Sequence, residues 1–151
     1  MIKLRPVGIV RNRIRTSGHR DWRRVESRII IEPEFEPALD GIEGFSNIIV
    51  VFWMDRLEPR GREVLKVHPQ GDKGLPMVGV FSARSPVRPN PLGLTTVRLV
   101  ERKRNVLKVA GLDAMNGTPV IDIKPFIPGH DLPKDAKVPG WLKEAERRHK
   151  H

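Results

Sequence analysis

The chain has 151 residues, enough for one domain with its own hydrophobic core, and its 28 Lys and Arg against 18 Asp and Glu give a formal charge of +10. It has no cysteine, which excludes a disulfide scaffold, a cysteine nucleophile and any zinc site built on thiolates. The charge favours a polyanionic partner. Charge alone does not separate a nucleic-acid-binding protein from one with a well-solvated, arginine-rich surface.

Short segments rich in Val and Ile, with Pro and Gly between them, predict strands. In chain order they lie at 7–10, 25–31, 48–54, 78–81, 94–100, 106–112 and 120–123. Residues 101–105 predict a polar hairpin turn, 37–39 a single helical turn, and 140–148, after Pro139, a terminal helix. Many short strands and few helices predict a mainly β fold, either a sandwich or a barrel.

The stretch from Ile48 to Met54 is the longest apolar run, which predicts a strand buried on both sides or one in a barrel wall. It is far shorter than a membrane span, and the first ten residues lack the apolar run of a signal peptide. We therefore expect a cytoplasmic protein without a membrane partner. The charged loop at 55–74 is too long for a passive hairpin connection.

Charge is segregated along the chain. The segment from Arg11 to Arg28 contains seven arginines and two carboxylates, and the segment from Arg84 to Arg104 contains six basic residues and one carboxylate. Residues 29–45 carry five carboxylates and no base. This segregation predicts a polarised surface, although runs of like charge are often only solvated faces.

Several common site signatures are absent. There is no Gly-rich dinucleotide fingerprint, phosphate-binding loop, His-Glu-x-x-His pair or Gly-x-Ser-x-Gly elbow. The histidines at 19, 68, 130, 149 and 151 have no ligand spacing, so no metal site is predicted.

The segment Phe81-Ser-Ala-Arg-Ser-Pro-Val-Arg-Pro-Asn-Pro-Leu-Gly93 has three prolines in close succession. They stiffen the loop and position Arg84, Arg88 and Asn90 at little entropic cost on binding. Two arginines and an amide on such a loop suit an anionic or carboxylate-bearing ligand. The alternative is a proline-rich crossover that only turns a corner.

The segment Leu112-Asp-Ala-Met-Asn-Gly-Thr-Pro-Val-Ile-Asp-Ile-Lys-Pro125 has a tight turn at Asn116-Gly117. Asp113, Asp122 and Lys124 are charges beside apolar strand residues, and a charge next to a buried strand usually needs a partner or ligand. Asp122 and Lys124 are equally consistent with exposed positions of a strand with period two.

These two segments, with Val7-Gly-Ile-Val10 and Gly41-Ile-Glu-Gly-Phe-Ser46, resemble the TrmO/YaeB-like family of S-adenosylmethionine-dependent tRNA methyltransferases over residues 5–133. The resemblance implies a single-sheeted β-barrel with a few short helices and a C-terminal helix. We expect the barrel domain at 1–135 and a basic helix and tail at 136–151. A homodimer with the cofactor near its interface is also implied.

The resemblance implies that S-adenosylmethionine is bound by two groups of residues. The first is Arg84 and Leu94, with Arg84 suited to pair with the methionyl carboxylate. The second is the stretch Ala110, Gly111, Leu112 and Asp113, whose backbone around Leu112 could hold adenine. Asp55 and Arg56 stand where longer relatives often have a His-Gln pair, so contacts there are expected but altered.

The implied reaction is methylation of N6 of N6-threonylcarbamoyladenosine at position 37 of tRNA. A carboxylate near N6 would help as a base, and Asp113 and Asp122 are the candidates. Phosphate or substrate contacts are expected from a set of polar residues, namely Arg88, Asn90, Lys124, Arg11, Arg13 and Arg15. The alternatives are a cofactor- or RNA-binding barrel without turnover and a small-molecule methyltransferase.

Overall fold

The computed structural model describes residues 1–16, 18 and 20–148, so the last three residues of the expected basic tail lie outside the described residues. The chain forms two compact units. The first comprises Met1–Asp55 and Leu92–Ile127, and the second comprises Arg56–Pro91 and Pro128–His151. The expected cofactor-binding residues therefore come from both units.

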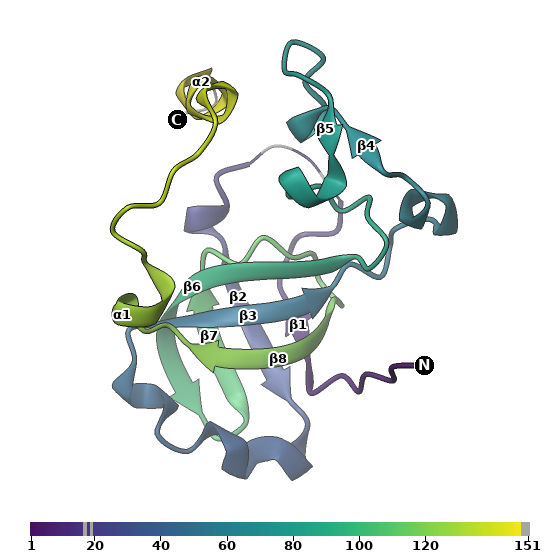
Figure 1. Ribbon diagram of the computed structural model, residues 1–151. Coiled ribbons are helices and arrows are strands. Elements are labelled where there is room, and N and C mark those ends of the chain that lie inside the picture. Colours follow the sequence, from purple (N-terminus) through teal and green to yellow (C-terminus); the bar gives the residue numbers. More distant parts are fainter. Residues whose placement is uncertain (17, 19, 149–151) are drawn as a thin grey trace. The chain divides into compact units, whose positions relative to one another are not determined.

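The first unit is a closed antiparallel barrel with the strand order β1-β2-β7-β6-β3-β8 (Figure 1). This confirms the predicted mainly β barrel. The strands are β1 (Gly8–Arg11), β2 (Glu26–Ile31), β3 (Asn47–Trp53), β6 (Leu92–Lys103), β7 (Val106–Ala110) and β8 (Pro119–Pro125). The 3-10 helices of this unit are η1 (Trp22–Arg24), η2 (Pro33–Leu39) and η3 (Ile42–Gly44).

The barrel core forms because apolar side chains alternate with others along each strand. In β3, Ile48, Val50 and Phe52 are buried, while the residues between them are half-buried on the outer face. The nearly continuous apolar run at 48–54 is therefore a barrel wall. All six strands contribute residues to one hydrophobic cluster; β6 adds Val97 near its middle, and the half-buried Leu99 packs against the cluster.

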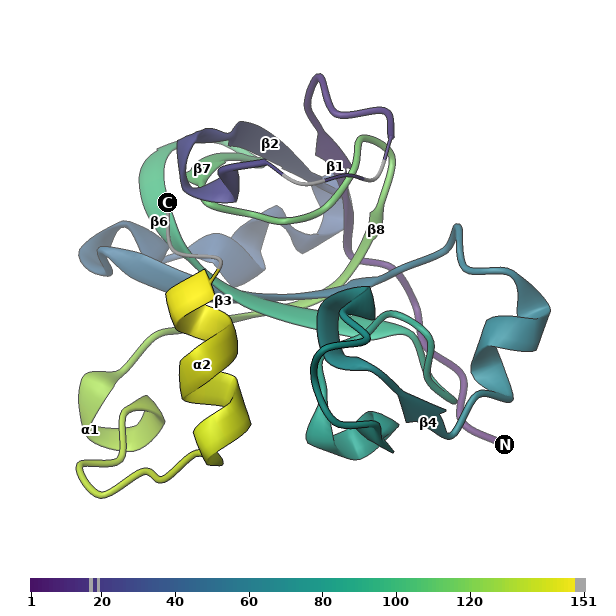
Figure 2. The ribbon, with the colours of Figure 1, turned by 90° about the horizontal axis from the view of Figure 1, so that it is seen from above.

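The long strand β6 closes the barrel by pairing with two neighbours in turn (Figure 2). Its first half pairs with β3, and from Arg98 onward it pairs with β7 across a register shift between Leu99 and Glu101. The predicted polar turn at 101–105 is thus too long. Residues up to Lys103 stay in the strand, and Arg104, with a φ of 53°, makes a tight turn with Asn105.

Gly93, in the proline-rich motif, has a packing role. A Cβ atom there would lie 2.3 Å from two ring carbons of the buried Phe52. Replacement Gly93→Ala is expected to lower the free energy of unfolding by about 1–3 kcal/mol, because the core must distort to admit the methyl group. Denaturant unfolding measures this. Gly44→Ala is the matched control, since nothing lies within 4 Å of its Cβ position; equal losses in both variants would contradict the packing role.

One barrel end is covered by η2 and η3, which include the predicted helical turn at 37–39. Arg102 of β6, whose side chain is only 13% exposed, ties them to the barrel. Its guanidinium donates to the Leu39 carbonyl at 3.2 Å and to Glu43 at 2.7 Å. The backbone N–H of Glu43 and then Arg102 lower the pKa of the Glu43 carboxyl. These charge-assisted bonds fix the cover in place.

The second unit is built from short elements and contains no sheet larger than one two-stranded ribbon among its described residues. It comprises η4 (Pro59–Arg62), β4 (Lys66–Val67), η5 (Pro69–Gly71), β5 (Val78–Gly79), η6 (Val80–Ser82), α1 (Pro128–Asp131) and α2 (Gly140–Arg148). Helix α2 confirms the predicted terminal helix. The strand predicted at 78–81 is only half as long, because the chain turns into η6 at Val80. Nowhere in the described residues is there a helix with the length and apolar character needed to cross a membrane.

Candidate functional site

The barrel end opposite η2 and η3 is closed by the loop that follows β7. Leu112 is fully buried and Ala114 nearly so, and both belong to the core cluster. Gly111 starts this loop with a φ of 99°, a conformation that favours glycine. Its N–H donates to the Val25 carbonyl at 3.0 Å. The predicted cofactor stretch at 110–113 is therefore held in one conformation by packing and backbone bonds.

The same loop places the predicted site residue Asp113 against β6. Asp113 is exposed and accepts a short hydrogen bond from the Thr95 hydroxyl of β6. Leu94, the residue before Thr95, presents a side chain that is 57% exposed. Because successive strand residues point to opposite faces, Leu94 lies on the outer face of β6, whereas Thr95 and Asp113 lie at the mouth of the barrel. A fixed carboxylate next to a rigid backbone stretch can accept bonds from the hydroxyls of a nucleoside.

Asn12, just after β1, links this loop to the barrel. Its amide nitrogen donates to the Ser27 hydroxyl at 2.9 Å and to the Ala114 carbonyl at 2.8 Å. Its side-chain oxygen accepts the N–H of Ile14 at 2.9 Å, and its own N–H donates to the Asn116 side chain at 3.0 Å. Sequence reasoning missed Asn12 and Thr95, because nothing in the order of residues shows which loops meet.

Asp55 follows β3, whose last residue Trp53 pairs with Leu92 at the start of β6. Asp55 therefore stands at the same barrel end as Leu94, and its N–H donates to the Trp53 carbonyl at 2.9 Å. Arg56 begins the second unit. The structure thus groups Leu94, Asp113 and Asp55 at one end of the barrel.

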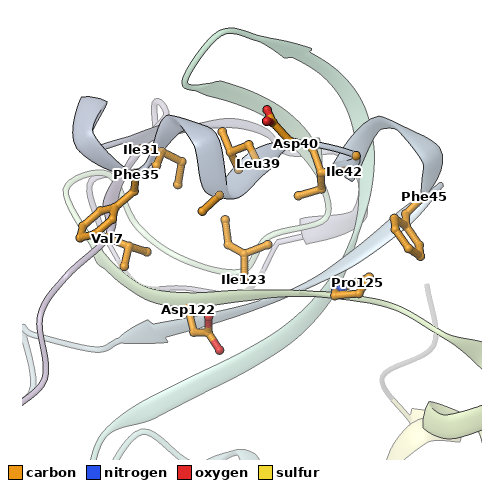
Figure 3. A pocket seen from close by; sticks show the side chains of 12 residues that line it. Val7, Ile31, Phe35, Leu39, Asp40, Ile42, Phe45, Asp122, Ile123 and Pro125 are labelled. Atoms are coloured by element: carbon orange, nitrogen blue, oxygen red, sulfur yellow. The ribbon is translucent and has the colours of Figure 1, made fainter.

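Asp122, the other predicted carboxylate, has a different environment. It forms an ion pair with Lys124 at 3.0 Å, which accounts for both charges on β8. It borders an apolar pocket of about 390 Å³ beneath η2 and η3, and the register pairs it with Val51, whose partner on the other side is Leu94. Figure 3 shows Ile123 pointing into this pocket and Asp122 pointing away from it. Asp122 therefore lies in one row with Val51 and Leu94, and its partner is Lys124 rather than the loop that carries Asp113.

In the second unit the proline-rich loop holds its two arginines differently. Arg88 is half-buried and donates to the carbonyls of Ala83 and Ser85, both at 3.1 Å, so its guanidinium braces the loop. Asn90 accepts a long hydrogen bond of 3.4 Å from Arg62. Arg84 is exposed, and no hydrogen bond or ion pair joins it to another described residue.

Arg84 also borders a pocket of the second unit, about 800 Å³ in volume. The pocket lies between this loop and helix α2, and Trp141 and Leu142 are among its walls. Phe81, at its edge, is 83% exposed. A free guanidinium beside aromatic and aliphatic walls can bind a carboxylate on a partly apolar ligand. The contribution of α2 was not foreseen from the sequence.

The fold and these loops define an antiparallel-barrel protein with polar loops at one barrel end and a proline-rich arginine loop. The family model described as tRNA-methyltransferase O N-terminal domain matches residues 17–132. The chain therefore belongs to this family, as its motifs predicted.

Relatives and solved structures agree with this assignment. A "Probable S-adenosyl-L-methionine-binding protein" of Methanothermobacter thermautotrophicus is 46% identical over 129 residues, covering 83% of this chain and 90% of the relative. One of the same name from Archaeoglobus fulgidus is 42% identical over 96% of this chain but 39% of its own length. The human "tRNA (adenine(37)-N6)-methyltransferase" is 37% identical over 77% of this chain and 25% of its own length. The solved "Crystal structure of TrmO" superposes with a TM-score of 0.72 at 28% identity, over 91% of this chain and 63% of that one.

Proposed function

We propose that the protein is an S-adenosylmethionine-dependent methyltransferase that methylates N6 of N6-threonylcarbamoyladenosine at position 37 of tRNA. The observation that carries the proposal is the barrel end where Thr95 fixes the Asp113 carboxylate of the rigid loop at 111–114. Support for N6 of adenine 37 of tRNA as the methylated position comes from the name of the human relative, of which this chain spans only a quarter, and the threonylcarbamoyl group rests on the motif resemblance alone. We also propose that the protein acts as a homodimer.

The donor groups fit the proposed cofactor. The rigid backbone around the buried Leu112 can hold adenine, the fixed Asp113 carboxylate can accept bonds from ribose hydroxyls, and the exposed Leu94 offers an apolar contact. Arg84, free of carboxylate partners in the described part of the chain, is available to the methionyl carboxylate. Asp55 and Arg56 complete the proposed set of cofactor-binding residues. Bound S-adenosylmethionine would supply a methyl group on a positively charged sulfur, which needs no help from a nucleophile of the protein.

The residues then have to orient the acceptor nitrogen and take its proton. N6 loses one proton when it gains the methyl group, and a carboxylate in reach is a suitable acceptor. Asp113 is favoured over Asp122, because Thr95 holds its carboxylate in place at the barrel mouth, whereas Asp122 is paired with Lys124. For the tRNA, the proposed contacts are Arg88, Asn90, Lys124, Arg11, Arg13 and Arg15.

Replacement Asp113→Asn tests the assignment of the base. The amide keeps the oxygen that accepts the Thr95 bond but removes the charge, so the rate of methyl transfer is expected to fall on the order of 10²-fold. Single-turnover kinetics with enzyme in excess over tRNA and with saturating cofactor measure the chemical step. Asp122→Asn is the matched control and should change the rate less than about threefold; the opposite ranking would transfer the role to Asp122.

The function itself is tested by incubating the protein with methyl-labelled S-adenosylmethionine and tRNA that carries or lacks the threonylcarbamoyl group. Label is expected in the nucleoside at position 37 of the modified tRNA alone. Label in neither tRNA, from a protein that binds the cofactor, would refute the proposal. Transfer to a small molecule without RNA would instead support a small-molecule methyltransferase.

A second candidate function is a cofactor-binding barrel without turnover. One observation favours it. Several archaeal relatives are named as S-adenosyl-L-methionine-binding proteins. It predicts calorimetric binding of the cofactor with no methyl transfer to any tRNA.

A further inference from the structure

The outer face of β1, β2 and β7 carries three cations in one row across the sheet. Register pairs Arg11 with Arg28 and Arg28 with Lys108. Strands lie about 4.8 Å apart, so the three side chains leave the barrel as close neighbours. Like charges that face each other across strands are destabilising. The row therefore lowers the stability of the folded state. The barrel fold itself does not require these three cations.

Two hollows meet along this row. One, of about 740 Å³, extends to Arg13 and Arg24 beyond the strand ends, and the other, of about 460 Å³, extends to Lys103 on β6. Both are lined by Arg28 and Lys108, so together they form one continuous surface. We call the six basic residues of this surface the basic strip, namely Arg11, Arg13, Arg24, Arg28, Lys103 and Lys108.

Carboxylates neutralise only part of the basic strip. Lys108 pairs with Glu26 at 3.4 Å, Lys103 with Glu101 at 3.6 Å and Arg24 with Asp21 at 3.5 Å. Within the described residues, Arg11, Arg13 and Arg28 have no carboxylate oxygen within 4.0 Å, and all three are exposed. The unpaired charges are thus guanidinium groups, which bind phosphate through paired donors.

We propose that the basic strip binds the phosphate backbone of RNA. Its length across four strands suits a chain of phosphates better than a single anion. A membrane surface fits less well, because none of the exposed large hydrophobic side chains of the described residues lies on β1, β2 or β7. Next to Arg13 and Arg11 stands Asn12, which is bonded to the loop at 111–116, so the strip leads to the candidate site. Arg28 and Lys108 were not among the RNA-binding residues predicted from the sequence, and they are added here because of their place in the structure. The identification of the RNA as tRNA rests on the proposed function.

The test compares two triple variants with equal net charge. The strip variant is Arg11→Gln/Arg28→Gln/Lys108→Gln, and the control variant is Lys134→Gln/Lys137→Gln/Lys143→Gln, from exposed positions outside the barrel. Affinity for a tRNA transcript is measured by fluorescence anisotropy at several salt concentrations. The strip variant is expected to bind at least tenfold more weakly and to reduce the slope of log affinity against log salt by about 2 to 3, one counterion per lost contact. The control variant should keep the slope of the unaltered protein.

Further arms separate the explanations. Arg11→Lys/Arg28→Lys keeps the charges and should keep the slope, and melting curves of all variants exclude loss of folding. Equal weakening in the strip and control variants would overturn the proposal, as would tighter binding to vesicles with anionic lipid than to tRNA. Loss of salt-dependent RNA binding in the strip variant supports the proposal even if no methyl transfer is detected. If the strip variant transfers methyl groups and binds tRNA as tightly as the unaltered protein, the role of the basic strip in RNA binding is refuted and the proposed function stands.

Discussion

Replacement Asn12→Ala is expected to lower the free energy of unfolding by about 3 kcal/mol. The change removes three side-chain hydrogen bonds, each worth about 1 kcal/mol, and leaves the nearly buried Ser27 hydroxyl and the Ala114 carbonyl without their donor. For a chain of this size the midpoint of thermal unfolding should fall by roughly 6–12 °C. Urea unfolding and calorimetry measure both quantities.

Two controls locate the effect. Ser27→Ala removes one of the three bonds and should cost about 1 kcal/mol, while Arg13→Ala, next to Asn12 but exposed, should stay within about 0.5 kcal/mol of the unaltered protein. The network also fixes the loop that carries Asp113, so Asn12→Ala should weaken cofactor binding more than Ser27→Ala does. A loss of stability no larger than that of Ser27→Ala would show that the network is not the anchor of this loop.

Replacement Arg84→Ala is expected to raise the dissociation constant for S-adenosylmethionine roughly 10- to 100-fold, because a charge-assisted bond to a carboxylate contributes about 1.5–3 kcal/mol. Stability should not change, since Arg84 has no bond to another described residue. Isothermal titration calorimetry gives the affinity. Arg84→Lys should lose less, as it keeps the charge but not the paired donors.

Arg88→Ala is the matched control for Arg84. It removes the bonds to the Ala83 and Ser85 carbonyls and should loosen the loop. We expect a loss of stability of about 1–3 kcal/mol, seen in unfolding curves before any ligand is added. If Arg84→Ala left the affinity unchanged, Arg84 would be removed from the proposed site; if Arg88→Ala alone lost affinity without losing stability, the two roles would be reversed.

Local patterns in the sequence predicted most of the barrel. The alternation in β3 and the Val- and Ile-rich runs around Ile29, Leu107 and Val120 identify strands, because inward apolar residues repeat every second position. The alternation of inward and outward residues also explains why the turn at 101–105 was mispredicted. Polar residues such as Glu101 and Lys103 look like a turn in sequence, yet they are the outward positions of a strand.

The sequence by itself determined the fold class, the family and the loops that carry the candidate residues, because these depend on composition, spacing and motifs along the chain. Only the tertiary structure decided which of those residues act together. Thr95 meets Asp113, Asn12 meets Ala114 and Arg28 stands beside Lys108 because barrel closure sets the register of strands far apart in sequence. The tertiary structure also distinguished the roles of Arg84 and Arg88. The Arg88 guanidinium donates to backbone carbonyls of its own loop, and the Arg84 guanidinium has no such bond to a described residue.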